Sequence, residues 1–158
     1  MKQHAKQIQG IDHYGVVAYV NDGTDKKNYV DGQFTGLQWQ CVEYARRWLL
    51  QVRGITFDDV ETAEDLWKRK TATSVQGTHR FKNSKKGIPT VGALLIYKKT
   101  NKAPFGHVAV IVDVHEDGKV DVAEQNYSLK KWKGYSRRVN MKDPDIIGWK
   151  TVTKLIYG

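Results

Sequence analysis

The only cysteine of the chain, Cys41, stands where a loop runs into an amphipathic helix, in the stretch GLQWQCVEYARRWLL that covers residues 36–50. A thiol of ordinary pKa, about 8.5, is mostly protonated at neutral pH, whereas attack on an amide carbonyl requires the thiolate. The positive end of a helix dipole favours the anion, and a neighbouring imidazolium favours it further. The position of Cys41 is therefore typical of a nucleophile.

An imidazole and a carboxylate are predicted at one end of a β-hairpin. The stretches 107–115 and 119–126 alternate as strands do, and the sequence EDGK that joins them carries the Asp-Gly pair of a tight turn. In a simple hairpin register the residue at 107 lies opposite position 127 or 128, so His107 falls at the same end as Glu124 and Asn126. Either of those two side chains can hold one tautomer of the imidazole through its second ring nitrogen.

Cys41 also has a purely structural interpretation. Free cysteine is among the most buried residue types, and this one lies on the apolar face of its predicted helix. The joint placement of cysteine, histidine and glutamate at the ends of elements favours catalysis instead. In that case the backbone N–H of Cys41 and the side chain of Gln40 are the candidate donors to the oxyanion. His79 and His115 are expected in solvated loops.

Two arginines follow Cys41 on the same predicted helix. The ordinary interpretation of Arg46 and Arg47 is a solvated helix face. Arg46 lies about one and a half turns from Cys41, from where a guanidinium can reach a substrate carboxylate. We therefore treat Arg46 as a candidate substrate-binding residue.

The elements that would position these side chains change character along the chain. A helix is predicted over 41–52, where apolar residues recur at helical spacing before Gly54, and a second helix near 60–70 with Asp58 or Asp59 as its cap. The second half alternates instead, which predicts strands at 91–98, in the hairpin and in the tail from 146, and an early strand is predicted at 14–20. The fold class expected is α+β, with N-terminal helices packed on an antiparallel β-sheet.

The chain length and the absence of a Pro-, Gly- or Ser-rich linker predict a single domain over residues 1–158, in which residues 1–13 are a candidate flexible N-terminal segment. No apolar run approaches the roughly 20 residues needed to cross a bilayer, so no membrane partner is expected. The N-terminus does not resemble a secretory signal, and a cytoplasmic location is expected.

The charge and the cysteine content limit the classes of partner and cofactor that we expect. The net charge is +9, which can attract an anionic polymer, but no basic helix or zinc-finger spacing is present and nucleic acid is not an expected partner. A single cysteine cannot form an intramolecular disulfide or a cysteine-cluster zinc site. We expect no metal and no other cofactor.

The stretches WQCVEYARRWL, GALLIYK, GHVAVIVDV, VDVAEQN and IIGW, in this order, resemble the CHAP domain, the cysteine- and histidine-dependent amidohydrolase/peptidase family. Within it they resemble the amidase domain of bifunctional glutathionylspermidine synthetase/amidases. The resemblance runs from about residue 15 to residue 149 and implies a papain-like CHAP fold. It implies that Cys41 is the nucleophile, His107 the general base and acid, and Glu124 the orienting residue, supported by Asn126. It also implies that Gln40 assists the oxyanion and that Arg46 lies near a glutathione moiety.

The bifunctional proteins carry a large ATP-dependent synthetase domain, for which 158 residues leave no room, so ATP and magnesium are not expected here. Three functions stay open. The first is hydrolysis of glutathionylspermidine, or a similar peptide-polyamine amide, to glutathione and spermidine. The second is a peptidoglycan amidase or endopeptidase acting on a cell-wall peptide. The third is a binding module whose cysteine is inert.

Overall fold

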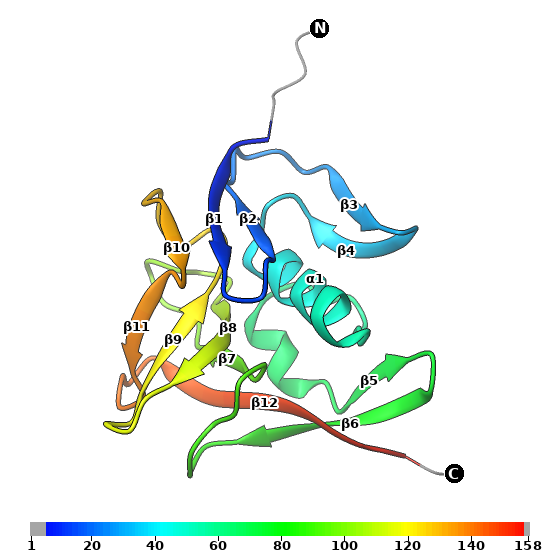
Figure 1. Ribbon diagram of the computed structural model, residues 1–158, viewed down its shortest axis with the longest axis vertical. Coiled ribbons are helices and arrows are strands. Elements are labelled where there is room, and N and C mark those ends of the chain that lie inside the picture. Colours follow the sequence, from blue (N-terminus) through cyan, green and yellow to red (C-terminus); the bar gives the residue numbers. More distant parts are fainter. Residues whose placement is uncertain (1–5, 157–158) are drawn as a thin grey trace, which may run out of the picture.

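The computed structural model describes residues 6–156, whose elements are drawn in Figure 1. Within that range lie one α-helix, α1 (Cys41–Arg53), and one short 3-10 helix, η1 (Glu64–Lys68). The strands are β1 (Ile8–Asp12), β2 (Val17–Tyr19), β3 (Lys27–Val30), β4 (Gln33–Leu37), β5 (Thr71–Ser74), β6 (Gly77–Ser84), β7 (Leu94–Tyr97), β8 (His107–Val114), β9 (Lys119–Ala123), β10 (Trp132–Gly134), β11 (Arg137–Asn140) and β12 (Ile146–Leu155).

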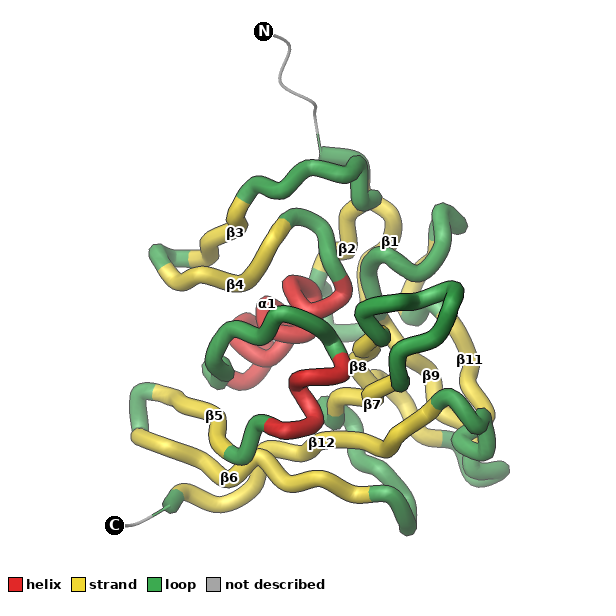
Figure 2. The backbone as a smooth tube through the Cα atoms, turned by 180° about the vertical axis from the view of Figure 1, so that it is seen from behind, coloured by secondary structure: helices red, strands yellow, loops and turns green. Residues whose placement is uncertain are grey.

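Antiparallel sheet is the main regular structure of the described chain. Seven strands form one sheet in the order β11-β9-β8-β7-β12-β6-β5, and every neighbouring pair in it is antiparallel. A smaller sheet has the order β10-β1-β2, and β3 pairs with β4. Figure 2 shows α1 between the β3–β4 hairpin on one side and the β5–β6 hairpin on the other.

The central strands β7 and β8 are buried because both faces of the sheet are covered. On one face Val108, Val110 and Val112 of β8 pack with residues of α1 such as Tyr44 and Trp48. On the other face Ala109 and Ile111 pack with residues of β9 and β11. The alternation expected along 107–115 is thereby confirmed, since successive strand residues point to opposite faces.

The elements nearest the predicted site agree with the sequence. Helix α1 begins at Cys41, and Gly54 ends it in the left-handed conformation, with φ 66° and its N–H bonded to the carbonyl of Leu50. The expected strands at 14–20, 91–98, 107–115, 119–126 and in the tail are confirmed as β2, β7, β8, β9 and β12. A β-bulge between Ile111 and Asp113 shifts the β8–β9 register by one residue and brings His107 closer along the ladder to Glu124.

The expectation of N-terminal helices packed on the sheet is wrong. One α-helix lies among the described residues of the first half, where β1 to β6 also lie. The helix predicted near 60–70 is only the five-residue η1. Thr56 and Thr73 form a β-bridge that closes the loop between them, and the N–H of Ala63 binds the carbonyl of Phe105. These long-range bonds leave no room for a longer helix.

Part of the segment expected to be flexible, residues 1–13, is ordered sheet. Residues 8–12 form β1, which pairs with β2 and with the distant strand β10. Residues 1–5 lie outside the described part of the chain. The side chain of Asp12, at the end of β1, accepts the indole N–H of Trp48 and the backbone N–H of Val16, and thereby ties this strand to α1.

Candidate active site

Cys41 is the first residue of α1 and is half-buried. The preceding residue, Gln40, has an extended backbone (φ −76°, ψ 163°), so the chain turns directly into the helix at the thiol. Backbone hydrogen bonds from Val42, in the first turn of α1, and from Val108, at the start of β8, stabilise the thiolate. The helix N-terminus contributes to the site as the sequence predicted.

His107 and Glu124 form a buried pair. Glu124 is 1% exposed and His107 is 7% exposed. Nε2 of His107 lies 2.7 Å from Oε1 of Glu124, and His107 is hydrogen-bonded to the Cys41 side chain as well. Because Nε2 faces the carboxylate, Nδ1 is the ring nitrogen left for the sulfur. Glu124, rather than Asn126, therefore holds the imidazole.

Glu124 is itself held by two neighbours that the sequence analysis missed. Arg137 of β11 binds it with two nitrogens, Nε to Oε2 at 2.7 Å and Nη2 to Oε1 at 2.8 Å. The hydroxyl of Ser136 donates to Oε2 at 2.7 Å. The ring of Tyr127 stacks on the guanidinium of Arg137, 3.6 Å from ring centroid to Cζ. No periodicity in the sequence marks this arginine, since it reaches Glu124 only through the pairing of β11 with β9.

These contacts set the charges of the site. Burial alone would raise the pKa of the Cys41 thiol, but the hydrogen bond to His107 and the imidazole charge hold that pKa below its usual range. Burial also disfavours the imidazolium, yet hydrogen bonds to Cys41 and Glu124 raise the pKa of His107 to about 9. Against its burial, hydrogen bonds from Arg137 and His107 lower the pKa of Glu124 to about 2. These contacts therefore favour a thiolate on Cys41, an imidazolium on His107 and a carboxylate on Glu124.

Asn126 and Gln40 contact each other beside the thiol. Asn126 has a left-handed backbone (φ 60°), which asparagine tolerates well, and its Nδ2 donates to Oε1 of Gln40 at 3.0 Å. This bond turns the oxygen of the Gln40 amide toward Asn126 and leaves its NH₂ group for another acceptor. Both side chains line the same cleft as Cys41.

A buried polar network under the site was also missed. Glu43, which is 0% exposed, accepts hydrogen bonds from Thr35, Arg47 and Gln125. Gln125 also donates to the backbone carbonyl of Gln40 and accepts the N–H of Tyr19. The network links the residue after Glu124 to the start of α1. Arg47 is thus an interior residue, and the solvated face expected for it is wrong.

Arg46 is likewise an interior residue, 1% exposed. Its Nε donates to the carbonyl of Phe57 at 2.9 Å and its Nη1 to the carbonyl of Thr35 at 3.1 Å. Its Nη2 lies 3.5 Å from Oδ1 of Asp59. The guanidinium of Arg46 thus holds β4 and the 57–59 loop against α1. These contacts do not support the expected role of Arg46 in binding substrate.

A cleft of about 1020 Å³ opens over the pair of Cys41 and His107. Its walls come from the start of α1, the loop at 59–63, the loop between β7 and β8, and Tyr127 and Arg137. Charges of both signs line it, namely Lys27, Asp59, Glu61, Lys98, Lys102, Asp143 and Asp145. Ligand pockets usually span about 300–1,000 Å³, so this cleft suits an extended peptide-sized molecule.

One cluster away from the cleft has the donors of a metal site. Ligand atoms of Asp113, His115 and Asp121 lie within 4.8 Å of one another, at the opposite end of β8 from His107. Asp121 already accepts from His115 at 2.9 Å and from Nε of Arg138 at 2.8 Å. Because the guanidinium neutralises the carboxylate, this cluster fits a structural ion pair better than a metal. His79 is also internal, bonded to Ser74 at 2.7 Å, and the solvated position expected for it is wrong.

A cysteine at a helix start, a histidine beside it and a carboxylate behind the imidazole are the groups with which cysteine-dependent hydrolases cleave amides. Residues 31–126 match the CHAP domain model, and the chain belongs to this family. It is an amidohydrolase. No helix of residues 6–156 has the length and apolar character required to cross a membrane.

The chain is also similar to curated proteins of known name. The chain is 30% identical to the trypanothione synthetase of Crithidia fasciculata over 149 residues, which cover 88% of this chain and 23% of that protein. It is 31% identical to the bifunctional glutathionylspermidine synthetase/amidase of Escherichia coli (strain K12) over 150 residues, which cover 81% of this chain and 24% of that protein. The chain thus spans about a quarter of these relatives. Among solved structures it is distantly similar to Ly7917, with 18% identity and a TM-score of 0.47 over 72% of this chain and 53% of that one.

Proposed function

We propose that this protein hydrolyses an amide through a thioester formed on Cys41. The observation that carries the proposal is the buried hydrogen-bonded series from Cys41 through His107 to Glu124 at the wall of the cleft. This series favours the charges that the first step of amide cleavage requires.

In the first step the Cys41 thiolate attacks the carbonyl carbon, and the carbonyl oxygen becomes an oxyanion. The backbone N–H of Cys41 and the NH₂ group of Gln40 donate to it. As the C–N bond breaks, Nδ1–H of His107 gives its proton to the leaving nitrogen, and a free amine and a thioester result. Water then loses a proton to Nδ1 and attacks the thioester, which releases the acid and restores the thiolate.

Three residues position these groups in the proposed mechanism. The Glu124 carboxylate keeps the Nε2 proton of His107 directed away from the sulfur, so that Nδ1 serves the reaction. Arg137 fixes Glu124 by its two hydrogen bonds. Asn126 fixes the Gln40 amide by donating a hydrogen bond from its Nδ2 to Oε1 of Gln40. Arg137 and Asn126 are thus positioning residues.

The substrate that we propose is glutathionylspermidine or a similar peptide-polyamine amide, which would be cleaved to glutathione and spermidine. The supporting observation is the identity of 31% to a protein named glutathionylspermidine synthetase/amidase. A cytoplasmic location and a single CHAP domain over residues 1–158 are part of the same proposal. The carboxylates of Glu61 and Asp143 on the cleft walls suit the cationic amine half of such a substrate.

Mass spectrometry of the products tests the proposal. The purified protein is incubated with glutathionylspermidine beside the variants Cys41→Ala and His107→Ala. We expect release of glutathione and spermidine by the native protein alone. Folded native protein that releases neither product would contradict the substrate, and release by Cys41→Ala would contradict the nucleophile.

A second candidate substrate is the peptide of peptidoglycan. The net charge of +9 favours this substrate, because a basic protein attracts the anionic surface of a cell wall and repels a cationic polyamine. Clearing of purified cell walls, measured as a fall in turbidity, tests it. Clearing by the native protein and none by Cys41→Ala would support this substrate, and unchanged turbidity with both would count against it.

A further inference from the structure

The excess positive charge of the chain is concentrated in one stretch of sequence. Residues 66–112 contain ten of the 26 lysines and arginines, while all 17 aspartates and glutamates lie outside this stretch. The rest of the chain is close to neutral. The charge of +9 is therefore a property of one region and not of the whole surface.

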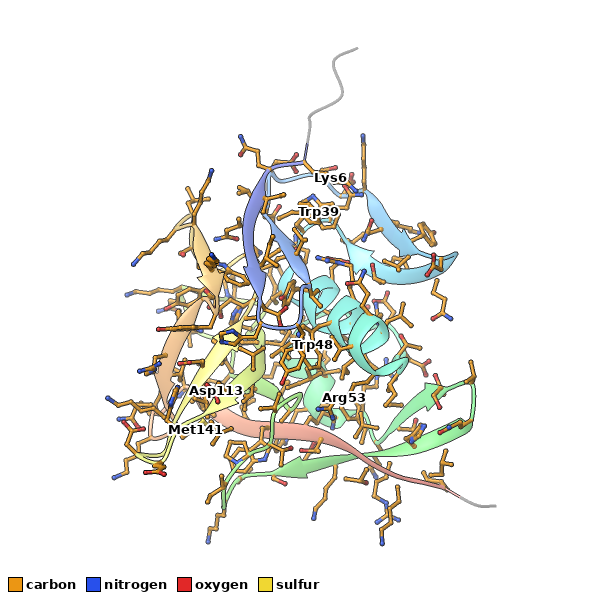
Figure 3. The ribbon with its side chains drawn as sticks, in the orientation of Figure 1. Lys6, Trp39, Trp48, Arg53, Asp113 and Met141 are labelled. Carbon is orange, nitrogen blue, oxygen red and sulfur yellow. The ribbon has the colours of Figure 1, made fainter. Side chains whose placement is uncertain are left out.

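Seven of these ten cations, at positions 68–70, 80, 82, 85 and 86, lie on or beside strands at one edge of the seven-stranded sheet, whereas Lys98, Lys99 and Lys102 lie in the loop between β7 and β8. The neighbouring strands β7, β12, β6 and β5 contain no carboxylate. Directly paired residues of an antiparallel sheet share a face, so Arg80 lies beside Thr71 and Lys82 beside Thr151. In Figure 3 side chains that end in nitrogen project from the region of β6 on the side away from α1. We name the outer surface of β5, β6 and β12 the basic sheet face.

More cations border this face. The carbonyl of Lys70 accepts the N–H of Phe81, so the segment 68–70 runs beside β6, and Lys85 and Lys86 follow the end of β6. Within residues 6–156, none of the lysines and arginines at positions 68–70, 80, 82, 85 and 86 lies within ion-pair distance of a carboxylate. Their mutual repulsion is a cost that a bound polyanion would relieve.

We propose that the basic sheet face binds an anionic, phosphodiester-linked wall polymer of the poly(glycerol phosphate) kind. This inference goes beyond the proposed function and does not depend on which amide the cleft hydrolyses. Alternate residues of a strand are about 6.8 Å apart, so Arg80 and Lys82 are spaced like successive phosphates of an extended three-carbon phosphodiester. Threonine hydroxyls between the cations can donate to phosphate oxygens.

The shape of the face favours this polymer over two other polyanions. Single-stranded nucleic acid is held by aromatic side chains that stack on bases, whereas the positions exposed on this face are threonine, lysine and arginine. Apolar side chains beside the cations strengthen binding to a lipid surface, whereas the exposed Val75 and Ile88 lie beyond opposite ends of β6. A polymer of sugar alcohols and phosphates requires neither feature.

The edge of the face adjoins the cleft. Nη2 of Arg69 donates to the backbone carbonyl of Asp59 at 2.7 Å, and Asp59 lines the cleft. A wall polymer bound to the basic sheet face would therefore keep the cleft close to the cell wall that contains this polymer.

Fluorescence anisotropy with labelled poly(glycerol phosphate) tests the inference on the full chain. The double variant Arg80→Gln/Lys82→Gln is compared with a matched pair of exposed lysines elsewhere, Lys130→Gln/Lys131→Gln, which changes the net charge equally. We expect binding that weakens as salt rises from about 50 to about 200 mM, an affinity about tenfold lower in the face variant, and a change below about twofold in the control.

Three results would overturn the inference. They are no binding by the native protein at the lower salt concentration, equal losses in the two variants, and equal or tighter binding of oligothymidylate or anionic vesicles. Thermal unfolding of both variants establishes that they are folded. Binding by Cys41→Ala is measured in parallel, so that a failure of amide hydrolysis and a failure of polymer binding are told apart.

Discussion

At the scale of single residues, the reactivity of Cys41 depends on groups that compensate for its burial. Removing a thiol from water raises its pKa, and here the imidazole of His107 and the N–H groups of Val42 and Val108 outweigh that effect. The imidazole is charged because Glu124 accepts from it, and Glu124 is ionised because Arg137 binds it. Each residue of the series thus sets the charge of the next.

The first prediction concerns pH. Alkylation of Cys41 by iodoacetamide is expected to have its midpoint below the ordinary thiol pKa of about 8.5, and His107→Ala is expected to move this midpoint above it, because burial then acts alone. Amide hydrolysis is expected to decline above pH 9, since the leaving amine takes its proton from His107, whose pKa is about 9. Alkylation and kcat/KM measured against pH check both points. An unchanged midpoint in His107→Ala would refute the ion pair.

The second prediction assigns a positioning role to Arg137. Arg137→Gln is expected to lower kcat about 10- to 100-fold with little change in KM, and to move the acid limb of the pH profile upward as the pKa of Glu124 rises. Arg138→Gln is the matched control, because Arg138 is the adjacent residue and binds a different carboxylate, Asp121. Equal kinetic effects of the two substitutions would argue against the role. A loss of kcat without a shift in the acid limb would indicate a structural effect only.

At the scale of elements, the site depends on how closely strand β4 approaches helix α1. Gly36 of β4 has a φ of 136°, and a Cβ atom at this position would lie 2.9 Å from the Cα of Glu43. This close contact aligns the helix whose first residue is the thiol. Hairpin β8–β9 is aligned separately, by its tight turn and its bulge.

The third prediction follows from that contact. Gly36→Ala is expected to cost about 2–4 kcal/mol in the free energy of unfolding, from backbone strain and overpacking together. Gly32→Ala, also at a positive φ but in open space, is expected to cost about 1 kcal/mol from strain alone. Urea unfolding measures both values. Similar losses would show that the approach of β4 to α1 adds nothing.

The fourth prediction concerns Lys150 of β12, which is 1% exposed and has its pKa lowered to about 8 by burial. Below pH 8 this lysine is charged in the folded and the unfolded states, so folding bears the cost of burying the charge. Between pH 8 and its ordinary value of about 10.5 only the unfolded state keeps the proton, and stability from this residue rises with pH.

Lys150→Met is therefore expected to stabilise the protein by about 1–3 kcal/mol near pH 7, and the gain is expected to shrink toward pH 10. Lys154→Met, at an exposed position of the same strand, serves as the control. Chemical unfolding at several pH values provides the measurement. A gain that does not depend on pH would mean that the buried charge is not its origin.

At the scale of the whole molecule, the distribution of charge bears on the choice of substrate. A net charge of +9 repels cations and attracts anions over distances of about a Debye length, roughly 10 Å at 0.1 M salt. A polyamine amide approaches the protein as a cation, whereas a wall fragment that carries phosphates approaches as an anion.

The fifth prediction is the sign of the salt effect. For glutathionylspermidine, kcat/KM is expected to rise as salt increases from about 10 to 150 mM, because screening weakens the repulsion. For an anionic wall fragment it is expected to fall over the same range. Steady-state rates with each substrate decide the sign. A fall with glutathionylspermidine would indicate that the carboxylates of the cleft dominate the approach of this cation.

Local patterns in the sequence predict the helix that begins at Cys41 and the hairpin that carries His107 and Glu124. The helical spacing after Cys41, the Asp-Gly turn and the alternation from His107 to Glu124 depend only on nearby residues, and the structure agrees with each of them. The prediction of a helix near 60–70 was wrong because long-range contacts, which a local pattern does not record, shape this segment. Its periodicity was real, but the bridge between Thr56 and Thr73 decides the path of that loop.

The sequence by itself determined the identity of the thiol, imidazole and carboxylate, and the elements that carry them, because both follow from residue type and short-range spacing. Only the tertiary structure decided that Glu124 and not Asn126 holds His107, that Arg137 holds Glu124, and that Arg46 is buried. These partners meet through strand pairing and helix packing between segments far apart in the chain. A buried charge takes whichever partner the fold brings within hydrogen-bond distance, and no local pattern records that choice.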